Sequence, residues 1–167
     1  MKLYAQIVDE KTKKLAVGLG TNSAFYESVG MVEMEVEQAY DGQWYVKGYA
    51  PLQPLEQMKE EMIAAFKECR NAEEVLPIGW NGSLYDYDSD SRERMRIKRQ
   101  DIEDKGGAGK ILWTLANNEK TEIGLDDFKG INSVAAERSE ALHDKYNSLK
   151  AKVEAATSKE ELENLVW

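Results

Sequence analysis

The chain has 167 residues, of which 42% are hydrophobic and 32% charged. This balance argues against global disorder and fits one domain or two small ones. The formal net charge is −9, so neither nucleic acid nor an anionic membrane is expected as a partner. One cysteine, Cys69, cannot form an internal disulfide, and we find neither a signal sequence nor a run of about 20 apolar residues. We therefore expect a cytoplasmic protein.

The first 50 residues have the alternation and turn signals of a small antiparallel β unit. We expect strands at residues 2–8, 15–20, 31–40 and 43–50 and a short helix at residues 23–30. Asn22 or Ser23 can cap that helix. Asp41-Gly42 is the strongest turn signal, because glycine readily adopts the positive φ of a type I′ turn.

A helical period replaces the alternation after Pro54. The apolar stripe of this segment has Lys and Glu opposite it and consists of Leu55, Met58, Met62, Phe66 and Cys69. The period predicts a helix over residues 55–70, which Pro77 stops. We interpret residues 51–76 as a helix that connects two units.

The pattern of residues 77–167 predicts hairpins packed on helices. We expect a hairpin closed by Asn81-Gly82, strands at 111–115 and 120–125, helices at 91–104, 126–155 and 158–166, and a loop at 106–109. Thr157 and Glu160 have the spacing of a capping box. The predicted fold class is α+β: a small antiparallel β-rich N-terminal unit (1–50), a connecting helix, and a C-terminal unit of hairpins packed on a long helix.

The helix expected at residues 126–155 carries a narrow apolar stripe, interrupted only at Arg138. The stripe consists of Phe128, Ile131, Ala135, Leu142, Tyr146, Leu149 and Val153. A stripe of this width suits either an internal core or a seam between chains. The stripe of residues 55–70 could also fill it from within the chain.

Patterns that would carry catalysis are incomplete. A nucleophilic scheme would need His143, the only imidazole, which we place on a helix surface. The GGAGK loop at 106–110 lacks the first glycine and the Ser or Thr of a phosphate-binding loop. Glu33, Glu35 and Glu37 would line one strand face, as an acidic chain produces by chance.

A calcium loop is also incomplete. Asp86, Asp88 and Asp90 have the spacing that opens such a loop, but Ser91 stands where glycine is needed and Ile97 where a bidentate Glu is needed. We interpret these aspartates as caps of the next helix and expect no metal and no cofactor.

One basic run departs from the acidic background: Arg92, Arg94, Arg96, Lys98 and Arg99. The run could contact nucleic acid or an acidic partner. It contains Glu93 and has no neighbouring aromatic residues, so we interpret it as an exposed helix face that pairs with the protein's own carboxylates.

The C-terminal half resembles a domain of unknown function found in tailed phages and prophages, often in tail-fibre or tail-fibre-assembly proteins. The motifs are WNGSLYDYDSDSRER at 80–94, ILWTLANNEK at 111–120, the helical sequence at 135–162 and the terminal tryptophan. The resemblance covers about residues 73–167. DGQWYVKGYAP in the N-terminal half is similar in layout to the β-rich heads of tail-fibre assembly proteins.

The resemblance implies a non-catalytic phage tail-associated interaction protein, either a tail-fibre assembly chaperone or a minor tail or fibre component. Its partner would be a phage tail or fibre protein, in the host bacterial cytoplasm or the virion tail. Fibre-associated proteins are commonly oligomeric, so we expect a homo-oligomer built partly on the helix at 126–155. The expected anchors of core or interface are Trp80, Trp113, Leu142, Tyr146, Leu149 and Trp167.

Two other functions remain open at this point. An acidic phage inhibitor of a host defence protein would imitate nucleic acid with a continuous stripe of carboxylates. A small glycan-acting hydrolase would need a cleft with two carboxylates at catalytic separation.

Overall fold

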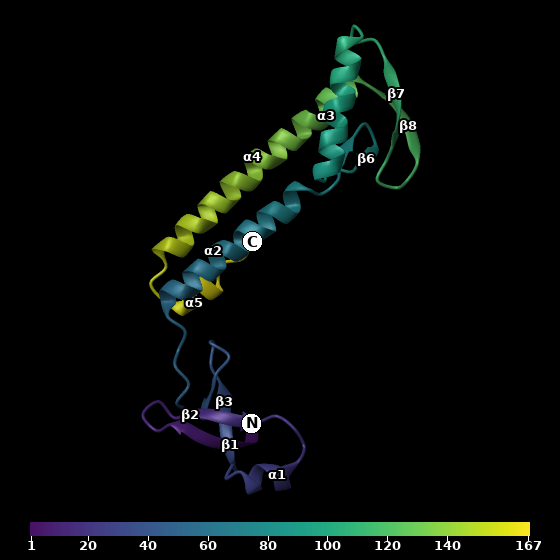
Figure 1. Cartoon of the computed structure of the whole chain (residues 1–167). Coiled ribbons are helices and arrows are strands. Elements are labelled where there is room, and N and C mark those ends of the chain that lie inside the picture. Colours follow the sequence, from purple (N-terminus) through teal and green to yellow (C-terminus); the bar gives the residue numbers. More distant parts are fainter. The chain divides into compact units, whose positions relative to one another are not determined.

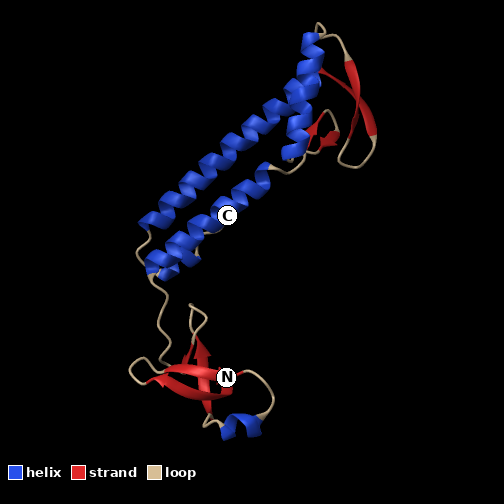
Figure 2. Ribbon diagram, in the orientation of Figure 1, coloured by secondary structure: helices blue, strands red, loops and turns tan.

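The computed structural model describes every residue from Met1 to Trp167. The chain divides into two compact units, residues 1–58 and 59–167 (Figure 1). The α+β class is confirmed, because antiparallel strands come first and a helix, hairpins and a long C-terminal helix follow (Figure 2). The boundary between the units lies in the first turn of helix α2 (Leu55–Glu74).

The first unit is a closed barrel with strand order β1-β2-β4-β3. Its elements are β1 (Lys2–Asp9), β2 (Lys14–Gly18), α1 (Ser23–Ser28), β3 (Val32–Gln38) and β4 (Trp44–Val46). Every neighbouring pair is antiparallel. Ala5, Leu15 and Val36 meet in its core, because alternate residues of each strand point inward.

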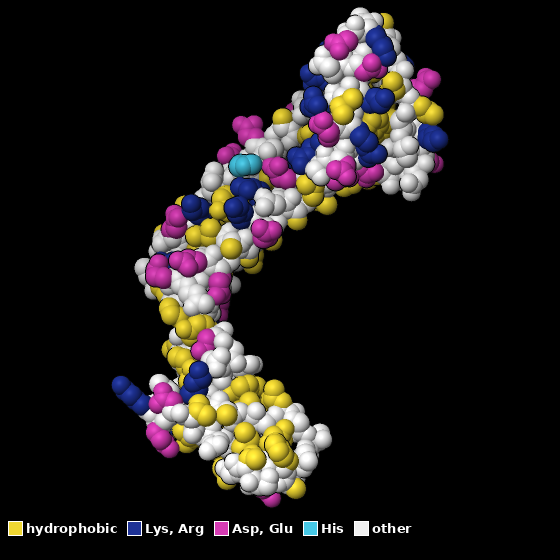
Figure 3. All heavy atoms as spheres, viewed as in Figure 1, with side chains coloured by type: hydrophobic (Ala, Val, Ile, Leu, Met, Phe, Trp, Pro, Cys, Tyr) yellow, Lys and Arg dark blue, Asp and Glu magenta, His cyan; other side chains and the backbone are white.

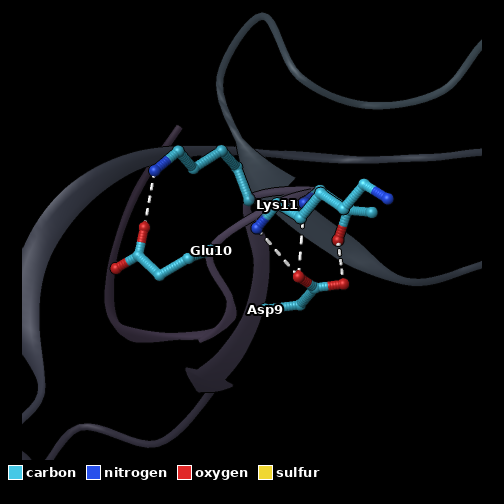
Figure 4. A network of polar contacts seen from close by, with 5 residues as sticks. Asp9, Glu10 and Lys11 are labelled. Carbon is cyan, nitrogen blue, oxygen red and sulfur yellow. Dashed lines mark hydrogen bonds and ion pairs between the residues drawn. The ribbon is translucent and has the colours of Figure 1, made fainter.

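The carboxylate of Asp9 organises the turn between β1 and β2. Its Oδ1 accepts the N–H of Lys11 at 2.9 Å and its Oδ2 accepts the hydroxyl of Thr12 at 2.8 Å (Figure 4). Hydrogen bonds from Thr12 and Lys11 hold the pKa of Asp9 below its ordinary value. Lys13, which has a left-handed φ of 59°, donates to Glu10 at 2.6 Å. The polar bonds thus hold a residue in a conformation that L-residues rarely adopt.

Tyr26 attaches helix α1 to the barrel. Its ring stacks on Tyr4 with centroids 5.8 Å apart, and it lies so close to Gly18 that a side chain there would collide with it. Asn22, one of the two predicted candidates, caps the helix by accepting the N–H of Phe25 at 3.1 Å. The helix ends at Ser28, two residues before the predicted end.

Strand β4 is shorter than the predicted segment 43–50. After Val46 the chain turns at Gly48, whose φ is +89°. Oε1 of Glu37 accepts the N–H of Ala50 at 2.9 Å and that of Gly48 at 2.7 Å. These bonds lower the pKa of Glu37. The carboxylate therefore takes backbone donors that a longer strand would have used.

The second unit consists of a stem and a head. We call residues 59–76 and 138–167 the stem, and residues 77–137 the head. The stem contains most of α2, the C-terminal half of α4 (Leu125–Ala155), and α5 (Lys159–Glu163). The head contains β5 (Ile78–Trp80), β6 (Ser83–Tyr85), α3 (Ser89–Asp104), β7 (Lys110–Thr114), β8 (Lys120–Gly124) and the start of α4.

In the head, two hairpins and α3 close over the start of α4. The rings of Trp113 and Phe128 meet edge-on with centroids 5.8 Å apart. Around them lie the other buried residues of this core, which are Ile78, Tyr85, Met95, Ile102, Leu115, Ile123, Ile131 and Ala135. Alternate residues of β7 and β8 supply it, as the predicted strand pattern requires.

In the stem, α2 and α4 lie side by side (Figure 1). Lys59 donates to the carbonyl of Glu154 at 3.3 Å, and the guanidinium of Arg70 lies 5.0 Å from the ring centre of Tyr146. Helix α2 extends to Glu74, beyond the predicted end at residue 70, because no helix-breaking residue precedes Pro77.

The last helix is shorter than predicted and its cap is shifted by one residue. Ser158 is the N-cap and its Oγ accepts the N–H of Glu161 at 3.3 Å. The carboxylate of Glu161 accepts the N–H of Thr157 at 2.6 Å. The predicted pair of Thr157 and Glu160 is therefore wrong. Ser158 and Glu161 have the same spacing, so the pattern alone could not choose between them.

Candidate binding groove

The outer edge of β7 has no partner strand along most of its length. β7 and β8 form a two-stranded sheet, and the N–H of Leu115 donates across it to Glu119 at 2.8 Å. In antiparallel strands, alternate residues direct their backbone groups to the same side. Leu112 and Thr114 therefore direct theirs away from β8.

The end of this edge is already occupied by β6. The N–H of Ala116, which also points away from β8, donates to the carbonyl of Leu84 at 2.9 Å. This bond places β6 beside the continuation of β7. The edge from Leu112 to Thr114 lies next to it and remains open.

Helix α3 forms the wall opposite this edge. Asp88 starts the helix by accepting the N–H of Ser91 at 2.8 Å and its hydroxyl at 3.0 Å, and these bonds lower the pKa of Asp88. Met95 and Ile102 are buried in the head core. Their positions fix the rotation of α3 and leave Arg94, Ile97 and Lys98 facing the open edge of β7.

A groove of about 520 Å³ separates α3 from β7. Arg94, Ile97 and Lys98 line one side, Asp86 lies after β6, and every residue from 111 to 115 contributes to the other side. Side chains alternate between the faces of a strand, so a groove that touches consecutive residues follows the strand edge. The groove therefore exposes the free edge of β7.

The groove combines apolar and cationic groups. Ile97 is 50% and Leu112 64% exposed. Lys98 has no ion pair, while Arg94 donates to the hydroxyl of Ser91 at 2.9 Å. Basic, acidic and hydrophobic side chains are interspersed over the head (Figure 3). Asp86 is the single carboxylate of the lining, against the two cations Arg94 and Lys98. The groove is therefore locally cationic on an acidic protein.

Two other basic residues of α3 pair within the helix, as predicted. Arg96 contacts Glu93 at 2.8 Å and Arg99 contacts Glu103 at 3.1 Å. The guanidinium of Arg92 lies 5.7 Å from the ring centre of Tyr87. The basic run thus consists of two ion-paired residues, Arg92 against an aromatic ring, and the two cations of the groove.

The predicted anchors of the head lie in or beside its core. Trp113 is 9% exposed and also contributes to the groove lining. Nε1 of Trp80 donates to Oδ1 of Asp127 at 3.1 Å. Oδ2 of Asp127 accepts the N–H of Gly124 at 2.9 Å, so this carboxylate joins β5 to the start of α4.

The predicted anchors of the stem are held within the chain. Leu142 is 7% and Leu149 9% exposed, and Tyr146 lies beneath Arg70. The single chain thus fills the expected seam itself. The homo-oligomer stays a prediction, but it would need a surface other than these leucines.

Trp167 fastens the C-terminus to α2. Its Nε1 donates to Glu73 at 2.6 Å and its ring lies 6.1 Å from that of Phe66. Nζ of Lys145 lies 4.4 Å from the ring centre of Trp167. The terminal residue therefore contacts both long helices of the stem.

Arg138 is a functional side chain of the stem that the sequence pattern did not identify. Its guanidinium donates to the carbonyls of Glu74 at 2.6 Å and Leu76 at 2.7 Å. Carbonyls at the end of a helix lack partners within that helix. Arg138, which interrupts the apolar stripe of α4, therefore caps the C-terminal end of α2.

The weaker sequence candidates are dispersed. His143 is exposed, with Nδ1 2.8 Å from the carbonyl of Ser139. Asp88 caps α3, whereas Asp86 lines the groove. The GGAGK loop borders a hollow that also contains Asp126 and Asp127, so carboxylates occupy the place where a phosphate would bind. No three His, Cys, Asp or Glu side chains converge in a metal-binding arrangement.

Comparison with known proteins identifies the family. Residues 57–165 match the family described as Domain of unknown function (DUF4376). The chain belongs to this family. The matched region begins in α2 and contains the rest of the second unit almost completely, including both walls of the groove. No curated protein and no solved structure matches the chain. None of the helices combines the length and apolarity needed to cross a bilayer.

Proposed function

We propose that this DUF4376 protein is a non-catalytic interaction protein of phage tails, a tail-fibre assembly chaperone or a minor tail or fibre component. Its groove between α3 and β7 holds the partner. The observation that carries the proposal is the open β7 edge, which exposes Leu112 in the same groove as Ile97. Proteins usually protect such edges, so an apolar edge within a groove favours a binding role. The phage setting rests on the motif resemblance.

The chemistry of the groove favours binding over the two other functions. Glycoside hydrolysis generally needs two carboxylates, and the groove offers only Asp86. A protein that imitates nucleic acid would present carboxylates to its target. This groove presents Arg94 and Lys98 instead.

Site-specific crosslinking tests the proposal. The purified full chain would be combined with each purified tail and fibre protein encoded by the same genome. We expect a stoichiometric complex with one of them. A photo-crosslinker replacing Lys98 in the groove should capture that protein, whereas one replacing the exposed Lys120 of β8 should not.

Two results would contradict the proposal. Failure of every tail and fibre protein to bind would rule out the phage tail setting. A complex captured from position 120 and not from position 98 would show that the partner binds elsewhere on the head.

A further inference from the structure

We infer that the groove binds an extended segment of its partner by strand addition to β7, and that this segment carries carboxylates on alternate residues. The inference rests on the proposed function and names the chemistry of the partner. It combines the geometry of the β7 edge with Arg94 and Lys98, two cations of α3 that line the groove and form no ion pair.

The backbone supports strand addition at β7. Leu112 and Thr114 direct their N–H and C=O groups out of the hairpin, and the bond from Ala116 to Leu84 shows that a second segment can pair along the same line. Exposed strand edges are templates for such pairing, with main-chain hydrogen bonds supplying affinity.

The outer edge of β8 is protected by comparison. On the exposed face of the hairpin, Leu112 lies opposite Glu122 and Thr114 opposite Lys120. The two charged residues belong to β8, and charges on an edge strand discourage pairing. On β7 the corresponding residues Leu112 and Thr114 are uncharged, and the charge of this strand lies at its start, at Lys110. The stretch from Leu112 to Thr114 is therefore the more suitable edge for the partner.

The cations match an acidic strand in spacing. Arg94 and Lys98 are one helical turn apart, which separates their Cβ atoms by about 6 Å. Alternate residues of an extended strand are separated by about 6.6 Å. Two carboxylates on one face of the segment can therefore meet both cations. The apolar side chains between them point to the other face, on which Leu112 lies.

A second copy of the chain that paired through its own β7 edge would fit the groove poorly. The β7 sequence KILWT contains no acidic residue and begins with Lys110. Pairing of two β7 edges would thus bring no carboxylate to Arg94 or Lys98. Strand β3 of a second copy has alternate carboxylates, but it already lies between β1 and β4 in a closed barrel. A different protein is therefore favoured as the occupant.

The first test measures peptide binding to the full chain by fluorescence anisotropy. The probes are labelled octapeptides that alternate Val with Glu or Val with Lys. We expect the Glu peptide to bind at least about tenfold more tightly than the Lys peptide and to weaken as salt rises.

Proline substitutions test the strand edge. Leu112→Pro removes an outward N–H and should abolish binding of the Glu peptide, while the fold tolerates proline at an outward edge position. Glu122→Pro is the matched control, because it makes the same change on the outer edge of β8 and should bind as the unmodified chain does. Circular dichroism would establish that both variants are folded.

Charge substitutions test the acidic preference. The double variant Arg94→Gln and Lys98→Gln should lose about tenfold in affinity for the Glu peptide. Arg92→Gln with Arg96→Gln removes the same charge from the same helix outside the groove. It should change affinity less than about twofold.

Four results would overturn the inference. They are no binding of either peptide at about 1 mM, equal binding of both peptides, unchanged binding by folded Leu112→Pro, or a dimer of the unmodified chain that Leu112→Pro dissociates. None of these would contradict a complex with a tail protein, which is measured separately. Conversely, Glu-peptide binding without any tail-protein complex would contradict only the phage tail function.

Discussion

Gly130 and Trp80 are in contact because residue 130 has no side chain. A Cβ at this position of α4 would collide with the six-membered ring of Trp80. The ring nitrogen of Trp80 donates at the same time to Asp127, one helical turn earlier. The indole is thus held between the backbone at Gly130 and the carboxylate of Asp127. These two contacts determine how β5 packs against α4.

Gly130→Ala should therefore destabilise the second unit, even though alanine favours helix. Relief of the collision requires movement of Trp80 or α4, which typically costs about 1–3 kcal/mol. Urea denaturation followed by circular dichroism would measure the loss. Gly79→Ala is the matched control, because an added Cβ there meets no atom within 4 Å. Equal stability of the two variants would contradict the packing described for Trp80.

Arg138→Met should also destabilise the stem. The variant keeps much of the apolar side chain but leaves the carbonyls at the end of α2 without their donors. A hydrogen bond to a charged group is typically worth about 1.5–3 kcal/mol. Chemical denaturation would measure the change in the free energy of unfolding. Met substitution of Arg96, which pairs only with Glu93 on the surface, should cost less than about 1 kcal/mol.

Asp127 should make stability depend on pH. The N–H of Gly124 and the side chains of Trp80 and Asn81 hold its pKa below the ordinary value of 3.8. The unfolded chain therefore takes up a proton at higher pH than the folded chain does. The stabilisation is fully present above the ordinary value and is lost as pH falls through the lower folded pKa.

Asp127→Asn should accordingly reduce stability near neutral pH and flatten its decline on acidification. Denaturation curves between pH 6 and about pH 2.5 would compare the two chains. The other carboxylates with lowered pKa values, such as Asp88, contribute equally to the pH dependence of both chains. If the stability of the unmodified chain and of Asp127→Asn fell in parallel with pH, the hydrogen bonds to Asp127 would not favour its ionised form.

Leu142→Lys with Leu149→Lys should unfold the stem rather than release a folded monomer. Both leucines are buried within one chain, and burial of unpaired ammonium groups typically costs several kcal/mol. Val166→Lys is the control, because Val166 is 75% exposed. Light scattering with circular dichroism would distinguish the outcomes. A folded, monomeric double variant of an oligomeric parent would assign the stripe to an interface between chains.

Local patterns predicted most elements of the fold. Asn81 and Gly82 have positive φ values of 48° and 76°, as the predicted hairpin turn requires. The period of the stripe predicted α4 to within one residue at its start. These signals are local in sequence, so they do not depend on where the elements pack.

The groove could be predicted only in part. The basic run was evident, but the choice of Arg94 and Lys98 depends on the rotation of α3, which the burial of Met95 and Ile102 determines. The open β7 edge depends on β6 pairing at Ala116 and not beyond it. Both are long-range packing relationships. The role of Arg138 had a sequence signal, a cation interrupting an apolar stripe, but its partners lie on another helix.

Gly130 and Arg138 also constrain how relatives of this chain can change in length. They lie about two helical turns apart on α4, where one receives Trp80 and the other binds the end of α2. Insertion of a single residue between them would rotate one contact away from the other by about 100°. Loops such as residues 105–109 have no comparable constraint. Insertions and deletions in the family should therefore accumulate in those loops and be absent between these two helical positions.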